Sequence, residues 1–324
     1  MMARGKISWR LGKHFSQNLD GFDVVFRSPG WPFFDPEIAK AKKFGTLVTN
    51  PMRYFFEICP SHRIIGVTGT KGKGTTASLI YAIIKKSRRR VWLGGNIGVA
   101  PFSFFSKIKK TDYVVLELSS FQLEDAVASP HIAVITNFSR EHQKAADPLN
   151  PNYHKSMISY WNAKSNIFRW QKLGDRLFVN SKLEKRNFEE GNSKVVFFGK
   201  SFLKTKLPGN HNKENIAAAV DVARFINISE GEIEKAVGEF RGLEHRIEIV
   251  REYNGVRYFN DSFATIPEST IIAIRSFKSS IILIAGGSDK ESNFASLAKN
   301  IKKKVKFVVL IKGEGSKKLG DPLK

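Results

Sequence analysis

Along most of this 324-residue chain, short runs of apolar residues alternate with segments whose apolar positions recur at helical spacing. Buried strands of a parallel sheet have the first pattern, and helices with one buried face have the second. The strand-like runs lie at residues 22–26, 46–49, 63–67, 113–116 and 132–135. The helical segments lie at residues 36–43, 75–86 and 215–226. This alternation predicts an α/β fold built on parallel strands.

The pattern changes near residue 240. Two apolar runs flank Asn254-Gly255 there, a pair of residues that favours a two-residue hairpin turn. The elements predicted in this part are strands at 247–250, 256–260, 280–285 and 307–311, a helix at 268–277 and a second helix between the last two strands. We therefore predict domain boundaries near residues 60 and 240, which give three domains at 1–60, 61–240 and 241–324.

Composition narrows the class of protein. The chain is 42% hydrophobic and 26% charged, as soluble globular proteins are. No apolar stretch approaches the roughly 18 residues that a membrane-spanning helix needs. The basic N-terminal segment lacks the apolar core of a secretory signal. With Cys59 as its one cysteine, the chain can form no internal disulfide, so we expect a cytoplasmic protein with a buried thiol.

The formal net charge of +23 raises the question of nucleic-acid binding. The excess lysine and arginine is spread along the whole chain, however, and interleaves no aromatic residues in a stacking pattern. We interpret it as a solvated surface that also suits anionic nucleotide substrates. Neither nucleic acid nor a membrane is an expected partner.

A glycine-rich segment between a predicted strand and a predicted helix carries the sharpest chemical signal. Glycines at 66, 69, 72 and 74 let the backbone N–H groups point at phosphate oxygens, and the helix contributes its positive end. Lys73 is placed to reach the β- and γ-phosphates, and Thr75 or Thr76 to bind Mg²⁺. Gly74 follows the lysine where the usual pattern has a hydroxyl residue. The segment predicts a nucleotide site.

Further segments follow in an order that resembles the Mur ligase family and its relative, folylpolyglutamate synthase. The Glu117–Glu124 segment is most similar to the Mur ligases that add D-glutamate. The matching segments are Gly69-Thr-Lys-Gly-Lys-Gly-Thr-Thr76, Gly95-Asn-Ile-Gly98, Glu117-Leu-Ser-Ser-Phe-Gln-Leu-Glu124, Thr136-Asn-Phe-Ser-Arg-Glu-His142, Tyr160-Trp-Asn-Ala-Lys164, Gly209-Asn-His-Asn-Lys-Glu-Asn215, His245-Arg246, Asn260-Asp-Ser-Phe-Ala-Thr265 and Gly286-Gly-Ser-Asp-Lys290.

The resemblance implies a central P-loop ATPase domain with a parallel sheet, flanked by two Rossmann-like domains. It implies an ATP-dependent ligase that joins D-glutamate to UDP-N-acetylmuramoyl-L-alanine through an acyl phosphate, in the synthesis of peptidoglycan precursors. ATP and two Mg²⁺ ions are the implied cofactors. We expect the enzyme to be a monomer.

Residue roles come from the same resemblance. The catalytic residues implied are Lys73, Glu117, His142 and Lys164, and the metal ligands are Thr75, Glu117, His142 and Lys164. Lys164 is expected to carry a carbamate. The nucleotide site is expected to comprise Gly69, Thr70, Lys71, Gly72, Lys73, Gly74, Thr75, Thr76, Asn212, Asn215, Arg246 and Asp261. The substrates are expected to contact Ser28, Asn96, Thr265 and Lys290.

The chain departs from the family pattern in several places. An insertion is expected after His142, and it brings His154 within reach as a rival metal ligand. Phe263 stands where many relatives have lysine. Both terminal domains are expected to be partial. Three alternatives stay open: another Mur ligase, a folylpolyglutamate synthase-like ligase, or a non-catalytic protein that binds nucleotides or nucleic acid.

Overall fold

The computed structural model describes residues 9–12, 14–141, 143, 151–288 and 292–323. The chain divides into two compact units, which are described separately. The first comprises residues 1–71, 92–177 and 182–196, and the second comprises residues 72–91, 178–181 and 197–324.

The N-terminal part of the first unit is a small parallel strand pair with one helix. Strand β1 (Val24–Phe26) pairs with β2 (Leu47–Thr49). Helix α1 (Pro36–Lys43) begins with proline after Asp35, whose side chain accepts a hydrogen bond from the Glu37 N–H. This start satisfies one free helix donor and uses a residue that lacks an N–H of its own. The helix buries Ile38 and Ala41 against Val48 of β2.

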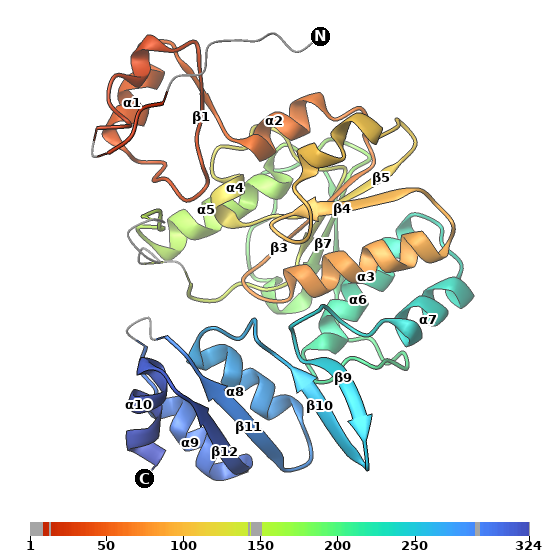
Figure 1. The fold of residues 1–324 in the computed structure, drawn as a ribbon. Helices are drawn as coiled ribbons and strands as arrows, with labels where there is room; N and C mark the ends of the chain where they lie inside the picture. The colour runs from red at the N-terminus through yellow and green to blue at the C-terminus, as the bar shows by residue number, and fades with distance from the viewer. Residues whose placement is uncertain (1–8, 13, 142, 144–150, 289–291, 324) are drawn as a thin grey trace. The chain divides into compact units, whose positions relative to one another are not determined.

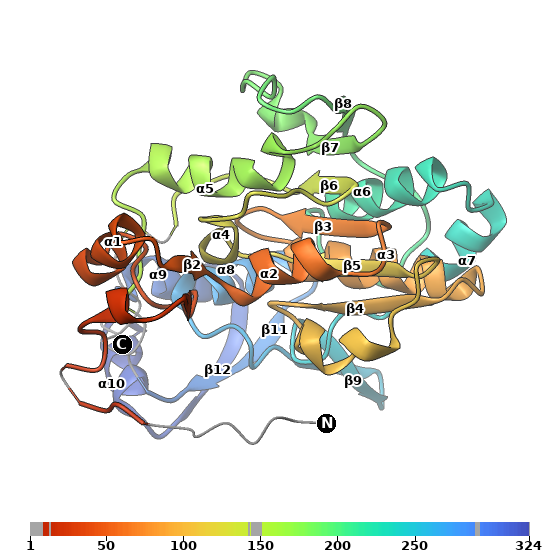
Figure 2. The same cartoon turned by 90° about the horizontal axis from the view of Figure 1, so that it is seen from above.

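A six-stranded sheet lies mainly in the first unit, in the order β4-β5-β3-β6-β7-β8 (Figure 2). Strand β3 pairs in parallel with both β5 and β6. Every residue of these three strands is buried, which explains their continuous apolar sequences. The strands are β3 (Ile64–Thr68), β4 (Val91–Gly95), β5 (Tyr113–Glu117), β6 (Ile132–Ile135), β7 (Arg176–Asn180) and β8 (Lys194–Phe198).

Three helices accompany this sheet in the first unit. They are α2 (Pro51–Ile58), α4 (Ser120–Leu123) and α5 (Met157–Arg169). The side chain of Asn50 caps α2 by accepting hydrogen bonds from two of its free N–H groups. Helix α4 packs against both α2 and α5, and α5 packs against β3.

The second unit contains a helical cluster in which α3 (Lys73–Lys86) packs against α6 (Asn212–Phe225) and α7 (Glu230–Glu239). Alanines of α6 and isoleucines of α3 are buried. Lys86 and Glu239 add an ion pair of 2.7 Å at the surface. Hydrophobic packing therefore holds these helices together, since an exposed pair contributes little.

The C-terminal part of this unit contains two separate strand pairs (Figure 1). Strands β9 (Glu248–Tyr253) and β10 (Val256–Asn260) form an antiparallel hairpin. Strands β11 (Ile281–Gly286) and β12 (Val305–Ile311) run parallel and pack against helices on one face. The helices are α8 (Pro267–Ser276), α9 (Ala295–Lys304) and α10 (Glu314–Gly320). Short 3₁₀ turns lie at Leu19–Gly21, Pro101–Ser103, Phe105–Lys107, Ser181–Leu183 and Asp321–Leu323.

The structure confirms the α/β class, the parallel strands and the hairpin at Asn254-Gly255. The predicted helix 36–43 and strand 132–135 match residue for residue. The prediction missed β4, β7, β8, α2, α4, α7 and α10, each of which is ten residues long or shorter and so offers few repeats of its pattern. Cys59 is buried, as expected. Among the described residues, no helix is long and apolar enough to cross a membrane. The three-domain division stays a prediction.

Candidate active site

Three loops leave the central sheet at the carboxyl ends of its strands. Because β3, β5 and β6 are parallel neighbours, the segments after Thr68, Glu117 and Ile135 all start at their carboxyl ends. Ligands of open parallel sheets bind at this edge. The glycine-rich loop, the Glu117 segment and the Thr136 segment are thereby brought together.

Side chains and backbone at the end of β6 fix the first half of the glycine-rich loop. The Thr136 hydroxyl and the Asn137 amide both donate to the Lys71 carbonyl, at 2.7 and 2.8 Å. The Asn137 side-chain oxygen accepts from the Lys71 N–H at 2.8 Å. At Gly69, φ is 144°, and a Cβ would lie 2.0 Å from the Thr136 hydroxyl oxygen. Glycine is therefore required there, because any side chain would collide with the group that holds the loop.

The second half of the loop runs into α3, where Gly72 has a φ of 81° and Lys73 is the first helical residue. A Cβ at Gly72 would lie 2.3 Å from the Asn215 side-chain oxygen. Asn215 is buried and donates to the Asn212 side-chain oxygen at 2.9 Å. The two asparagines predicted for the nucleotide site therefore form a pair beside the loop. Thr76 is fully buried, and no described group hydrogen-bonds its hydroxyl.

Glu117 ends β5 with a buried carboxylate. The residue is 3% exposed, and its Oε2 has no hydrogen-bond partner among the described residues. Burial without a partner is costly for a carboxylate unless a cation or ligand compensates. The Asn96 N–H donates to the Glu117 carbonyl at 2.8 Å, so the predicted substrate residue Asn96 lies beside it. Asn96 itself is exposed.

Lys164 reaches the same edge from α5. Lys164 is 1% exposed, and its Nζ donates a hydrogen bond to the Gly69 carbonyl at 2.7 Å. The ammonium lies 4.7 Å from the centre of the Tyr160 ring. Burial raises the pKa of Tyr160, so its phenol stays protonated near neutral pH. Lys164 is therefore not a solvated surface lysine of its helix but is buried against the phosphate loop.

The two histidines considered as metal ligands have different positions. His142 lies outside the described residues. His154 is 2% exposed, and its Nε2 lies 2.8 Å from the Ser120 hydroxyl, while Nδ1 lies 3.5 Å from Glu124. These contacts engage both ring nitrogens of His154 with the α4 segment. The described part of the chain has no cluster of three or more His, Cys, Asp or Glu side chains that could hold a metal ion.

The candidate residues of the C-terminal part are more exposed. Arg246 stacks over the Phe263 ring at 4.7 Å, and Asp261 accepts from the Ile247 N–H at 3.0 Å. Burial raises the pKa of Asp261, although Arg246 opposes the shift. Ile247 has a φ of 47°, an unusual conformation for a β-branched residue, so this loop is strained. Thr265 is exposed, and Lys290 lies outside the described residues.

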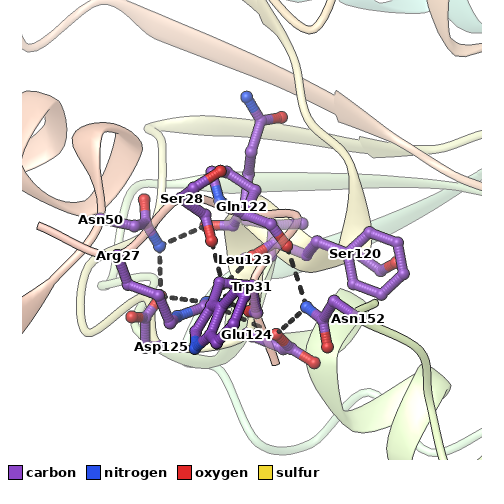
Figure 3. A network of polar contacts seen from close by, with 12 residues as sticks. Arg27, Ser28, Trp31, Asn50, Ser120, Gln122, Leu123, Glu124, Asp125 and Asn152 are labelled. Carbon is purple, nitrogen blue, oxygen red and sulfur yellow. Dashed lines mark hydrogen bonds and ion pairs between the residues drawn. The ribbon is translucent and has the colours of Figure 1, made fainter. Parts of the chain in front are cut away.

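A polar cluster that the motif analysis missed surrounds the turn at Ser28 (Figure 3). Arg27 is 2% exposed and pairs with Glu124 and Asp125 at 3.4 and 3.6 Å. Asn152 donates to the carbonyl of Pro29 at 2.9 Å and to Glu124 at 3.1 Å. Its one sequence signal was a charged residue, Arg27, following an apolar strand directly. The predicted substrate residue Ser28 is exposed beside this cluster.

The arrangement provides a glycine loop at a helix start, a buried carboxylate and a buried lysine at one sheet edge. A glycine loop followed by lysine and threonines at a helix start defines the class of P-loop nucleotide-binding proteins. Glu117 supplies a ligand suited to a hard cation such as Mg²⁺.

Comparisons with known proteins give the family. The Mur ligase middle domain matches residues 67–202, and the Mur ligase glutamate ligase domain matches residues 245–323. A UDP-N-acetylmuramoylalanine–D-glutamate ligase from Acetivibrio thermocellus is 42% identical over 334 residues, which cover 94% of this chain and 70% of that protein. The chain belongs to the Mur ligase family.

Solved structures agree on the fold. The UDP-N-acetylmuramate–alanine ligase of Thermotoga maritima superposes with a TM-score of 0.61 at 20% identity, over 93% of this chain and 74% of that one. A bifunctional folylpolyglutamate synthase/dihydrofolate synthase, solved with Mn, AMPPNP and L-glutamate, gives 0.59 at 15% identity, over 84% and 83%.

Proposed function

We propose that this chain is the ligase that adds D-glutamate to UDP-N-acetylmuramoyl-L-alanine, with ATP converted to ADP and phosphate. The similarity to a ligase of that name over 94% of the chain carries the proposal. The buried Glu117 and Lys164 beside the phosphate loop support it, because a plain binding protein has no use for two such costly residues.

The reaction has two steps. The substrate carboxylate attacks the γ-phosphate of ATP, which gives an acyl phosphate and ADP. The amine of D-glutamate then attacks the acyl carbon, and phosphate leaves from the tetrahedral intermediate. Because two anions meet in the first step, the site must supply positive charge. Lys73 and the N–H groups of residues 69–72 are suited to supply it.

Mg²⁺ would provide further charge at the phosphates. Glu117 Oε2, which has no hydrogen-bond partner in the described part of the chain, fits this role, since a buried carboxylate oxygen without a hydrogen bond is a ready ligand. Thr75 or Thr76 offers a hydroxyl at the start of α3, and His142 and Lys164 are the other expected ligands. We propose this set as the metal site and expect two ions.

Lys164 is proposed to carry a carbamate formed from CO₂, which converts its ammonium into an anionic ligand. The reaction needs the neutral amine, and burial of a lysine favours that form. As a carbamate, Lys164 would join Glu117 as a metal ligand and help to hold the metal ion at the phosphates.

The remaining candidate residues divide between nucleotide and substrates. Asn212 and Asn215 are proposed to bind the adenine side of ATP, and Arg246 with Asp261 its phosphates and ribose. Thr265 and Lys290 are proposed to hold D-glutamate. Ser28 and Asn96 are proposed to bind the UDP-linked substrate. We expect a monomer that works in the cytoplasm, where nucleotide-linked precursors are made.

Phosphate release from ATP tests the proposal. The assay contains UDP-N-acetylmuramoyl-L-alanine and is run with and without D-glutamate. Release that requires both substrates is the expected result. A panel with L-alanine, a diamino acid and folate plus L-glutamate identifies another family activity instead. Binding of ATP without release on any substrate contradicts the ligase assignment.

A further inference from the structure

The cluster around Arg27 joins parts of the first unit that are distant in sequence. We call Arg27, Asn50, Glu124, Asp125 and Asn152 the Arg27 cluster (Figure 3). Arg27 ends the β1 segment, Asn50 starts α2, the two carboxylates follow α4, and Asn152 precedes α5. The cluster therefore lies where four segments meet.

Arg27 closes the turn that follows it. The Trp31 N–H donates to the Ser28 carbonyl at 3.0 Å, which makes residues 28–31 a β-turn with Pro29 in its second position. The Arg27 guanidinium donates to the Trp31 carbonyl at 2.6 Å and to the Phe121 carbonyl at 3.4 Å. One side chain thus ties the end of the turn to helix α4.

Asn152 holds the middle of the same turn from the other side. Its backbone N–H donates to the Gly30 carbonyl at 3.0 Å, and its side-chain amide donates to the Pro29 carbonyl at 2.9 Å. With the bonds from Arg27 and within the turn, all four carbonyls of residues 28–31 have donors. The Ser28 residue itself stays exposed and offers a hydroxyl donor.

The two carboxylates of the cluster are themselves held by other side chains. Glu124 accepts from Asn152 at 3.1 Å and lies 3.5 Å from His154 Nδ1. Asp125 accepts a hydrogen bond from the Asn50 side chain, whose oxygen caps α2. These contacts therefore fix the position of the turn relative to α2 and α4. Helix α4 directly follows β5, the strand that ends at Glu117.

A buried charge cluster of this kind contributes little net stability, because removing the charges from water offsets most of their attraction. Its directional contacts instead define one geometry. Two donors from separate segments converge on one four-residue turn, which is more than a surface turn needs to stay folded. The contacts therefore indicate that the turn has to be held in one position.

We propose that Arg27 and Asn152 are positioning residues that preset the Ser28-Pro29-Gly30 turn to bind the UDP-linked substrate. The inference rests on the proposed function, because that function identifies the substrate. With the carbonyls withdrawn into the cluster, the turn presents the Ser28 hydroxyl to an anion without exposed acceptors beside it. Asn152 lies in the segment after His142 in which the sequence predicts an insertion.

Two variants and two matched controls test this role in the full chain. Arg27→Lys keeps the charge but loses the planar fork that reaches two carbonyls. Asn152→Ala removes the amide but leaves the backbone contact. The controls are Arg169→Lys, which changes an arginine paired with Glu190 at 2.7 Å, and Asn187→Ala in an exposed turn.

The expected result is a rise in KM for UDP-N-acetylmuramoyl-L-alanine of roughly tenfold in each variant, the size expected for one buried hydrogen bond to a charged or constrained group. The kcat and the KM values for ATP and D-glutamate should stay within about twofold, since the turn contacts neither in this scheme. Amide hydrogen exchange of residues 27–34, measured without substrate, should accelerate in both variants and in neither control.

Two results would overturn the inference. One is unchanged exchange and unchanged KM in both variants. The other is an equal loss in the KM of all three substrates together with lower thermal stability, which indicates a merely structural cluster. If the wild-type chain neither binds nor consumes the UDP-linked substrate, the proposed function fails and the link to this substrate fails with it. The exchange experiment then still decides whether Arg27 and Asn152 order the turn.

Discussion

The central sheet and the C-terminal strand pair differ in how completely their residues are buried. Strands β3, β5 and β6 are buried at every position, whereas β11 alternates between half-buried and exposed residues. Ile282 and Ile284 of β11 are 65% and 66% exposed, and Phe307 of β12 is 62% exposed. The central strands are thus covered on both faces, while the C-terminal pair is covered on the helix face alone in the described chain.

The candidate residues follow the same division. Glu117 and Lys164 are buried at the central sheet, but Arg246 and Thr265 are exposed in the C-terminal part. A buried residue has its position set by packing, whereas an exposed one gains it on binding. We propose that the central part is organised for chemistry before substrates bind, and that the C-terminal residues act through ligand contact.

The largest effect is expected at the buried lysine. Lys164→Ala should lower kcat by at least about 10³-fold, because it removes the metal ligand proposed above from a buried position. Activity of the wild type should also rise with added bicarbonate. Phosphate release measures both, and Lys172→Ala, which changes an exposed lysine of the same unit, is the control. Full activity of Lys164→Ala would remove the carbamate from the mechanism.

A pair of core and surface substitutions compares the two sheets directly. Leu116→Ala in β5, at 0% exposure, should lower the free energy of unfolding by about 2–5 kcal/mol. Ile284→Ala in β11, at 66% exposure, should change it by less than about 0.5 kcal/mol. Urea unfolding followed with hydrogen exchange assigns each loss to its own unit. Equal losses would mean that the exposed face of β11 is covered in solution.

The pH dependence of stability should differ between the two regions. Burial raises the pKa of Glu124 to about 7, with Arg27 and Asn152 opposing the shift and Asp125 adding to it; Lys42 and His154 also face this carboxyl. A raised carboxyl pKa favours the folded state at low pH. This contribution is lost as pH rises from about 4.5 to about 7, and amounts to at most about 3 kcal/mol.

Glu124→Gln should remove that dependence. Thermal unfolding between pH 4.5 and 8 should show the wild type losing stability relative to the variant as pH rises. A wild-type curve parallel to that of Glu124→Gln would mean that Arg27 keeps the carboxyl ionised throughout this range.

The smallest effect is expected in the C-terminal loop. Burial also raises the pKa of Asp261, so its contribution to stability likewise declines as pH rises through that pKa. Asp261→Asn should flatten the pH dependence by less than Glu124→Gln does, because Asp261 is half-buried beside the exposed Arg246. The same thermal scans measure it. A larger change at Asp261 than at Glu124 would reverse the contrast between the two regions.

Local sequence determined the elements that carry the chemistry. The runs at 63–67, 113–116 and 132–135 are apolar throughout because both faces of their strands are buried, and the structure contains a strand at each. Glycine at 69 and 72 follows from the left-handed or mirror conformations and close approaches of the phosphate loop. The apolar runs and the positions of the glycines can be read from the local sequence, although the groups that approach Gly69 and Gly72 come from distant segments.

The tertiary structure alone decided which distant residues meet. Arg27 contacts Phe121 across 94 positions, and Asn152 contacts Pro29 across 123. The burial of Lys164 against Gly69 and the engagement of His154 with Ser120 are equally non-local. Periodicity reports which face of an element is buried but not what covers it. The partner is set by strand register and helix packing, which arise from the whole chain.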